Sequence, residues 1–110
     1  MTARVTSDFW VSAYLRRCAV AGVVAVLRRR GAAEAGAIMI KVDRLDGTAL
    51  LLGPAPQSEA AEAGERGFAP VHREPTIDSA AAEARLAREI GFDPDVWIVE
   101  VEDREGRAFL

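Results

Sequence analysis

The chain has 110 residues, of which half are apolar and 28% are charged, a balance that is typical of one globular domain and excludes a disordered chain. Its net charge of −3 argues against general affinity for nucleic acid, and its single cysteine excludes an intramolecular disulfide and a thiolate metal cluster. We therefore expect a single cytoplasmic domain over residues 1–110.

The first expected element is a helix over residues 8–21. Ser7 offers an N-cap before an acidic first turn, and apolar side chains then recur at helical spacing. Gly22 suits a left-handed stop, and the β-branched run at residues 23–27 predicts a strand, with a helix that continues to Arg30 as the alternative. The apolar stretch that joins the two elements is too short to cross a bilayer, so we expect no membrane association.

The clearest strand lies at residues 37–42, where alternate side chains are apolar. A second apolar run follows at residues 48–52, and Asp46-Gly47 lies between the two runs, the strongest local signal for a β-hairpin. Residues 53–67 are rich in Pro, Ala, Ser, Glu and Gly, a composition typical of a flexible surface loop. We expect a meander of three strands, including the one before this hairpin, followed by a loop.

A short strand is expected next at residues 68–72, and its proline confines it to a sheet edge. Thr76 or Asp78 can cap the second helix, which is rich in alanine and ends at Gly91. Phe92 follows directly, where it can make a hydrophobic closing contact with the helix.

The last long strand is predicted at residues 96–102. Its first half is apolar on both faces and contains Trp97, so we expect it in the centre of the sheet, and a short strand at residues 107–110 would close the fold. This order of elements predicts an α+β fold of two layers, with a mostly antiparallel sheet of four or five strands and both helices on one face.

Five groups of residues are similar to those of a known family. They are Trp10-Val11-x-Ala13, Leu15-Arg16-Arg17, Arg29-Arg30-Gly31 with Ala35-Gly36-Ala37, Lys41-Val42-x-Arg44-x-Asp46-Gly47, and Phe92-Asp93-Pro94-Asp95-x-Trp97-x-Val99-Glu100-x-Glu102-Asp103-Arg104-x-Gly106-Arg107. On these motifs the chain resembles an uncharacterised family of small bacterial proteins, a domain of unknown function. The resemblance implies a bacterial, cytoplasmic, single-domain protein and supplies no catalytic residues.

Acidic residues of the last strand are the best candidates for chemistry. Glu100 and Glu102 alternate on one strand face, so with Asp103, and with Asp46 from the hairpin, they can ligate a hard cation such as Mg²⁺. A nuclease-like site would have a lysine after the second acid, and here Asp103 and Arg104 follow it. The alternative is a solvated strand face paired with arginines. We expect neither a resident metal nor another cofactor, and the only histidine, His72, is expected to be an exposed bystander.

Arginines form two blocks that can share one surface. Arg16 and Arg17 lie on the first helix, and Arg28, Arg29 and Arg30 end the strand after it. Such a patch can hold a phosphate or an acidic protein surface, although no aromatic side chains interleave with it to stack on bases. The alternative is a set of salt bridges to the acidic second half of the chain, where residues 51–110 carry thirteen acidic and six basic side chains.

Three functions remain open on the sequence. The first is a non-enzymatic protein-interaction module, homodimeric through a sheet edge or an apolar helix face, because no motif for a nucleophile or a nucleotide is present. The second is a metal-assisted hydrolase that uses the acidic residues, so whether the protein is an enzyme stays open, with a non-enzyme favoured. The third is weak nucleic-acid binding through the arginine blocks.

Overall fold

The computed structural model describes residues 5–56 and 66–110. In chain order its elements are α1 (Ser7–Val20), β1 (Ala25–Arg29), β2 (Ile38–Asp43), β3 (Thr48–Pro54), β4 (Phe68–Pro70), β5 (Ile77–Asp78), α2 (Ser79–Phe92) and β6 (Trp97–Glu102). The six strands form one mixed sheet in the order β1-β6-β2-β3-β4, with β5 paired to β3. The fold is therefore α+β as expected, with more strands than the four or five predicted.

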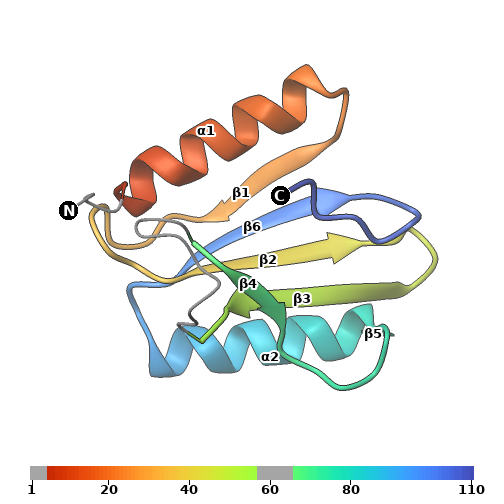
Figure 1. The fold of residues 1–110 in the computed structure, drawn as a ribbon. Helices are drawn as coiled ribbons and strands as arrows, with labels where there is room; N and C mark the ends of the chain where they lie inside the picture. Colours follow the sequence, from red (N-terminus) through yellow and green to blue (C-terminus); the bar gives the residue numbers. More distant parts are fainter. Residues whose placement is uncertain (1–4, 57–65) are drawn as a thin grey trace.

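Strand β6 lies between β1 and β2, so the predicted meander of β1, β2 and β3 is wrong at its first step. It pairs antiparallel with β1 and parallel with β2, where Ile38 lies opposite Trp97. The sheet is mixed because α2 carries the chain back along the sheet before β6 begins (Figure 1). The central position predicted for residues 96–102 is confirmed, since a strand that is apolar on both faces is stable only between two neighbours and under two covers.

The two helices cover opposite faces of the sheet, and the prediction that both lie on one face is wrong (Figure 1). Successive β2 residues show the reason, because Ile38 and Ile40 pack in the core under α1 whereas Met39 packs in the core under α2. A strand with buried side chains on both faces needs a layer on each side. The core under α1 is the larger one and contains Val11, Tyr14, Cys18, Ile38, Ile40, Val42, Leu52, Trp97, Val99 and Val101.

The start and end of α1 follow from local chemistry. Thr6, rather than the predicted Ser7, is the N-cap, and its side-chain oxygen accepts a hydrogen bond from the Phe9 amide. The buried Ser7 hydroxyl instead donates to the Gly36 carbonyl. The helix ends before Gly22, whose φ of 75° confirms the left-handed stop, so the chain then forms a strand rather than a longer helix.

The hairpin predicted at Asp46-Gly47 is confirmed between β2 and β3. Asp46 Oδ1 accepts hydrogen bonds from the Thr48 amide at 2.9 Å and from the Thr48 hydroxyl at 2.6 Å, and Gly47 has a φ of 88°. An aspartate that binds the backbone two residues on and a glycine in the left-handed region are the chemistry of a tight turn. The lowered pKa of Asp46 has the same cause, first the hydrogen bond from the Thr48 hydroxyl and then that from its amide.

Two expectations at element ends are wrong. Residues 107–110 form no strand, and the Tyr14 hydroxyl donates to the Ala108 carbonyl while Phe109 packs against the core under α1. Phe92 makes no closing contact with the helix, because its side chain is 83% exposed. Among the described helices, neither is long and apolar enough to cross a membrane.

Candidate functional site

The most enclosed charge of the described chain belongs to Lys41, in the middle of β2. Its side chain is only 5% exposed, and it lies on the α2 side of the sheet because it alternates with the buried Ile40 and Val42 of the other face. Its ammonium donates to the Ser79 hydroxyl at 3.0 Å and to the Glu83 carboxylate at 2.7 Å, both in the first turns of α2. The Glu100 carboxylate of β6 lies 3.9 Å away. Burial of a lysine is tolerated only with such partners.

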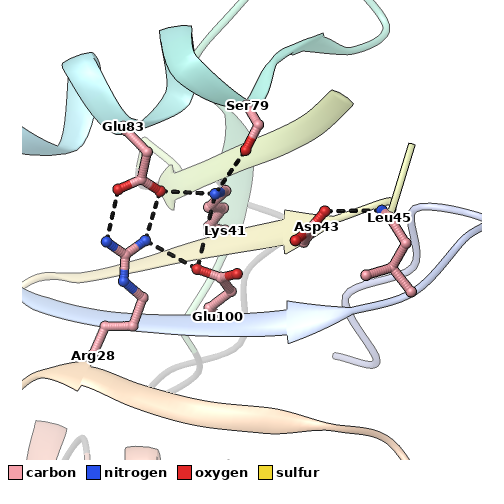
Figure 2. Close-up of polar contacts among 7 residues, drawn as sticks. All are labelled: Arg28, Lys41, Asp43, Leu45, Ser79, Glu83 and Glu100. Carbon is pink, nitrogen blue, oxygen red and sulfur yellow. Dashed lines mark hydrogen bonds and ion pairs between the residues drawn. The ribbon is translucent and has the colours of Figure 1, made fainter. Parts of the chain in front are cut away.

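Arg28 of β1 completes this arrangement (Figure 2). Its two terminal nitrogens donate to the two oxygens of Glu83, each at 2.7 Å, and one of them also donates to Glu100 Oε1 at 2.9 Å. This fork-to-fork geometry is the strongest form of an arginine–carboxylate pair. We call Arg28, Lys41, Ser79, Glu83 and Glu100 the charged cluster; its two cations and two carboxylates balance, and it ties α2 to three strands.

The contacts of the charged cluster favour the ionised forms of Glu83 and Arg28. Hydrogen bonding from Arg28, and then from Lys41, lowers the pKa of Glu83 to about 2, while Glu83 raises the pKa of Arg28. The Lys41 ammonium, both terminal nitrogens of Arg28 and both oxygens of Glu83 are engaged inside the cluster. A serine–lysine catalytic pair would need the lysine amine to accept the serine proton, whereas Lys41 donates to Ser79 and to Glu83. The arrangement therefore acts as a structural tie and presents no unpaired acid, base or nucleophile.

The acidic residues singled out by sequence lie in three different settings. Glu100 belongs to the charged cluster, and Glu102 lies exposed on the same face of β6. Asp103 accepts hydrogen bonds from the Arg107 amide at 2.7 Å and from its guanidinium at 2.9 and 3.0 Å, which lower its pKa to about 2. Asp46 is held in the hairpin turn. Within residues 5–56 and 66–110 no three histidine, cysteine, aspartate or glutamate side chains are grouped to hold a metal ion.

The arginines of the two predicted blocks point in different directions. Arg28 lies in the charged cluster, and Arg29 donates to the carbonyls of Pro94 and Val96 at 2.9 and 2.8 Å. Arg30 lies over the Trp97 ring, with its guanidinium carbon 5.1 Å from the centroid. Arg16 and Arg17 are on α1, on the opposite side of the sheet from Arg28, and the Arg17 guanidinium lies over the Tyr14 ring. These contacts use most of the arginines to fasten neighbouring segments.

Sequence reasoning missed Lys41, Glu83 and the role of His72. Lys41 is the only lysine and interrupts an otherwise apolar strand, which is a signal for a paired buried charge, but its partner in α2 is 42 residues away. His72 is no bystander. Its Nε2 accepts the Leu51 amide at 3.0 Å and its Nδ1 lies 2.8 Å from the Glu74 carbonyl, so it pairs a β3 amide between the stretches where β4 and β5 pair with β3.

Comparison with known proteins identifies relatives along nearly the whole chain. A family model described as "Protein of unknown function (DUF1491)" matches residues 5–110. The crystal structure of a DUF1491 family protein from Caulobacter crescentus CB15 is 38% identical, with a TM-score of 0.78 over 96% of this chain and 92% of that one. An NMR structure of a DUF1491 family protein from the same organism has the same identity and a TM-score of 0.80, covering 99% and 94% of the two chains.

A solution structure of a protein from A. tumefaciens is also similar, with 38% identity, a TM-score of 0.79 and coverage of 97% of this chain and 92% of that one. No curated protein matched the chain. Both organisms are bacteria, as the resemblance implied, and none of these relatives carries a stated activity.

Proposed function

Because this chain belongs to the DUF1491 family, whose description states no function, we propose a function from its own surfaces. We propose that it is a small non-enzymatic interaction module that forms a homodimer through the outer edge of β1. The observation that carries the proposal is an apolar, unprotected sheet edge. Strand β1 is the first strand of the sheet order, and its neighbour on one side is β6. In the described part of the chain no strand pairs with its other side.

The exposed side chains of this edge are apolar. Val24 is 56% exposed and Val26 is 50% exposed, and both lie on the α2 side of the sheet, to which Arg28 of the same segment also points. Native edge strands that avoid pairing usually carry lysine, proline or an inward charge. Here the two arginines, Arg28 and Arg29, end the strand at an irregularity in register between Leu27 and Arg29, and the three residues before them carry no charge.

The hydrogen-bond pattern fixes which groups face outward. The Glu102 amide donates to the Val24 carbonyl, and Val26, two residues after Val24, lies opposite Glu100. In an antiparallel pair every second residue bonds to the same neighbour, so the backbone groups of Val24 and Val26 both point toward β6. The amides and carbonyls of Ala25 and Leu27 therefore point to the open edge. An antiparallel copy can pair there with Ala25 opposite the partner's Leu27.

The regular part of β1 selects this register among those that the hydrogen-bond pattern permits. With the two-fold axis at Val26, the two copies of Val26 meet at a closely spaced pair, and Arg28 lies opposite the partner's Val24. An axis at Leu27 would instead place each Arg28 opposite the partner's Val26, and it would extend the pairing into the irregular end of β1. Cross-strand β-branched pairs stabilise a sheet, so the axis at Val26 is favoured.

The proposed interface is small, so the dimer should be weak. Two strands of five residues bury less than the roughly 1,200 Å² of a standard stable interface, and we expect a Kd of about 10–1,000 µM. Sedimentation equilibrium of the full chain from about 10 µM to 1 mM should show a monomer–dimer equilibrium. Val26→Lys should abolish it, because the new charge would meet its own symmetry mate.

Val20→Lys is the matched control, because Val20 is 84% exposed at the end of α1, on the other side of the sheet, and the same charge is added. This variant should dimerise like the wild type. A wild-type chain that stays monomeric at 1 mM, or two variants that behave alike, would contradict the proposal. We treat the chain as a single cytoplasmic domain. In the described residues neither the metal-assisted hydrolase nor the nucleic-acid binder has a grouped site that would support it.

A further inference from the structure

A groove lies between the second half of α2 and the strands beside it, on the opposite side of β2 from β1. Its volume is about 450 Å³, within the range of small-molecule sites. Strands β2 and β3 form the floor of the groove, and the residue after β4 and one side of α2 form its walls. The lining residues are Met39, Leu51, Gly53, Pro54, Val71, Arg85, Arg88, Glu89 and Phe92. We call this the α2 groove.

The floor of the α2 groove is apolar and shaped by a glycine. Met39 and Leu51 belong to the buried core under α2. A Cβ atom at Gly53 would lie 3.1 Å from the Met39 sulfur and 3.0 Å from a Val71 methyl, closer than ordinary contact. Met39 and Val71 therefore pack directly against the Gly53 backbone, where only a glycine leaves room for them. Methionine is flexible, so the floor can adapt to an inserted aliphatic chain.

One cation in the wall is available to a ligand. Arg85 donates to the Val71 carbonyl and so bridges the groove at one position. Arg88 is exposed and makes no hydrogen bond or ion pair with any residue that the structure describes. Glu89 contributes one negative charge against these two arginines, so the wall carries an excess of one positive charge. Phe92 adds an apolar side chain that is 83% exposed.

We propose that the α2 groove binds a small aliphatic monocarboxylate, with its chain against the exposed side chains of Val71 and Phe92 and its carboxylate on Arg88. An exposed phenylalanine, an apolar floor and an unpaired guanidinium match a ligand that has one apolar body and one anionic end. The guanidinium fork suits a carboxylate because it can donate two parallel hydrogen bonds. This site is separate from the β1 edge and does not depend on dimer formation.

The test titrates the full chain with octanoate, octanol and octylamine while NMR follows the Met39 methyl and the Phe92 ring. Octanoate should shift both signals in a saturable way and bind at least about tenfold more tightly than the alcohol, since a charge-assisted hydrogen bond is lost with the alcohol. Octylamine should bind more weakly still. No saturable binding of octanoate up to 10 mM, or equal binding of all three, would overturn the proposal.

Variants then test the two halves of the site. Arg88→Gln should weaken octanoate by about tenfold, whereas Glu89→Gln should tighten it because a repelling charge is removed. Arg104→Gln is the matched control, since Arg104 is exposed and lies beyond β6, away from the groove. Equal effects of Arg88→Gln and Arg104→Gln would overturn the assignment of the anion site.

Gly53→Ala should weaken octanoate and octanol together, because the new methyl group presses on Met39 and Val71 in the lining and leaves the charge unchanged. A short acetylated peptide that ends in leucine carries the same carboxylate and apolar group. If that peptide binds the groove and octanoate does not, the ligand is a protein C-terminus and the small-molecule proposal is wrong.

Discussion

The two faces of the sheet are built from the same strands and are covered in different ways. Under α1 the side chains form one continuous apolar core from β3 across β2 and β6. Under α2 the apolar core is smaller and consists of Met39, Leu51, Leu86, Val96 and Ile98. The charged cluster lies on this same face of the sheet (Figure 2). Hydrophobic burial therefore dominates one face, and paired charges position the helix on the other.

The same difference explains where the surfaces for binding lie. A helix that is anchored by Lys41 and Arg28 at its first turns leaves part of its face of the sheet uncovered at both sides. On one side Val26 of β1 and Val24 just before it stay exposed, and on the other side the α2 groove opens beside β3 and β4. The four predictions below test this contrast, from the largest effect to the smallest.

Truncation of the apolar face should have the largest effect on stability. Trp97→Ala removes a side chain that is 1% exposed, together with the hydrogen bond from its indole N–H to the Ala32 carbonyl at 2.7 Å. We expect the free energy of unfolding, measured by urea denaturation, to fall by about 3–5 kcal/mol. Phe92→Ala is the control and should change it by less than about 0.5 kcal/mol. Equal losses would show that the core is not where the structure places it.

Removal of the buried ammonium tests the charged cluster. Lys41→Met keeps the apolar stem and leaves two carboxylates with Arg28 alone, so the free energy of unfolding should fall by about 1–3 kcal/mol, less than for a fully buried pair because Glu83 is 42% exposed. In the double variant with Glu83→Gln much of the loss should be recovered, since the unpaired charge is gone. A double variant that loses the sum of both single effects would show that the two residues are not coupled.

Acid should weaken the attachment of α2. The pKa of Glu83 is about 2 in the folded chain and about 4.5 when exposed, so its contribution is complete above pH 4.5 and is lost as the pH falls toward 2. After discounting for solvent screening we expect this contribution to be about 1–2 kcal/mol. Urea unfolding at pH 6 and pH 3 should show a smaller acid-induced loss for Glu83→Gln than for the wild type. Asp103→Asn, at a second carboxylate with a lowered pKa, should leave the Glu83 contribution intact.

The smallest effect is expected at the far side of the sheet. His72→Ala leaves the Leu51 amide without its side-chain acceptor, but water can replace the histidine at this edge position. We therefore expect the free energy of unfolding to fall by about 0.5–1 kcal/mol. Hydrogen exchange should report faster exchange of the Leu51 amide in the variant. Unchanged exchange at Leu51 would contradict the assigned hydrogen bond.

Local sequence signals predicted the elements well and their arrangement only in part. Gly22, Asp46-Gly47 and the alternation of β2 act over a few residues, and each was confirmed in the structure. The side of the sheet that each helix covers depends on contacts between distant segments. The local signs that both faces are covered were Met39 beside Ile40 in β2 and Ile98 beside Trp97 in β6. The resemblance correctly indicated a bacterial family of unknown function, which is shown by the match over residues 5–110.

The candidate site was the least predictable feature. Glu100 was singled out for metal binding, yet its partners Arg28 and Lys41 come from two other strands. Glu83, which binds both of these cations, comes from α2, so no sequence spacing indicates that the four residues meet. Arg28 was likewise grouped with its sequence neighbours, whereas β-strand alternation and the register shift separate their side chains. Long polar side chains reach partners that propensity and periodicity do not specify.

The most direct measurement of the proposed β1 edge is amide hydrogen exchange followed by NMR at two protein concentrations. Val26, whose backbone faces β6, should be protected at about 20 µM and at about 1 mM alike, whereas Ala25 and Leu27 should exchange rapidly in the dilute sample and become at least about fivefold slower in the concentrated one. Rapid exchange of Ala25 and Leu27 that does not change with concentration would contradict dimer formation through this edge.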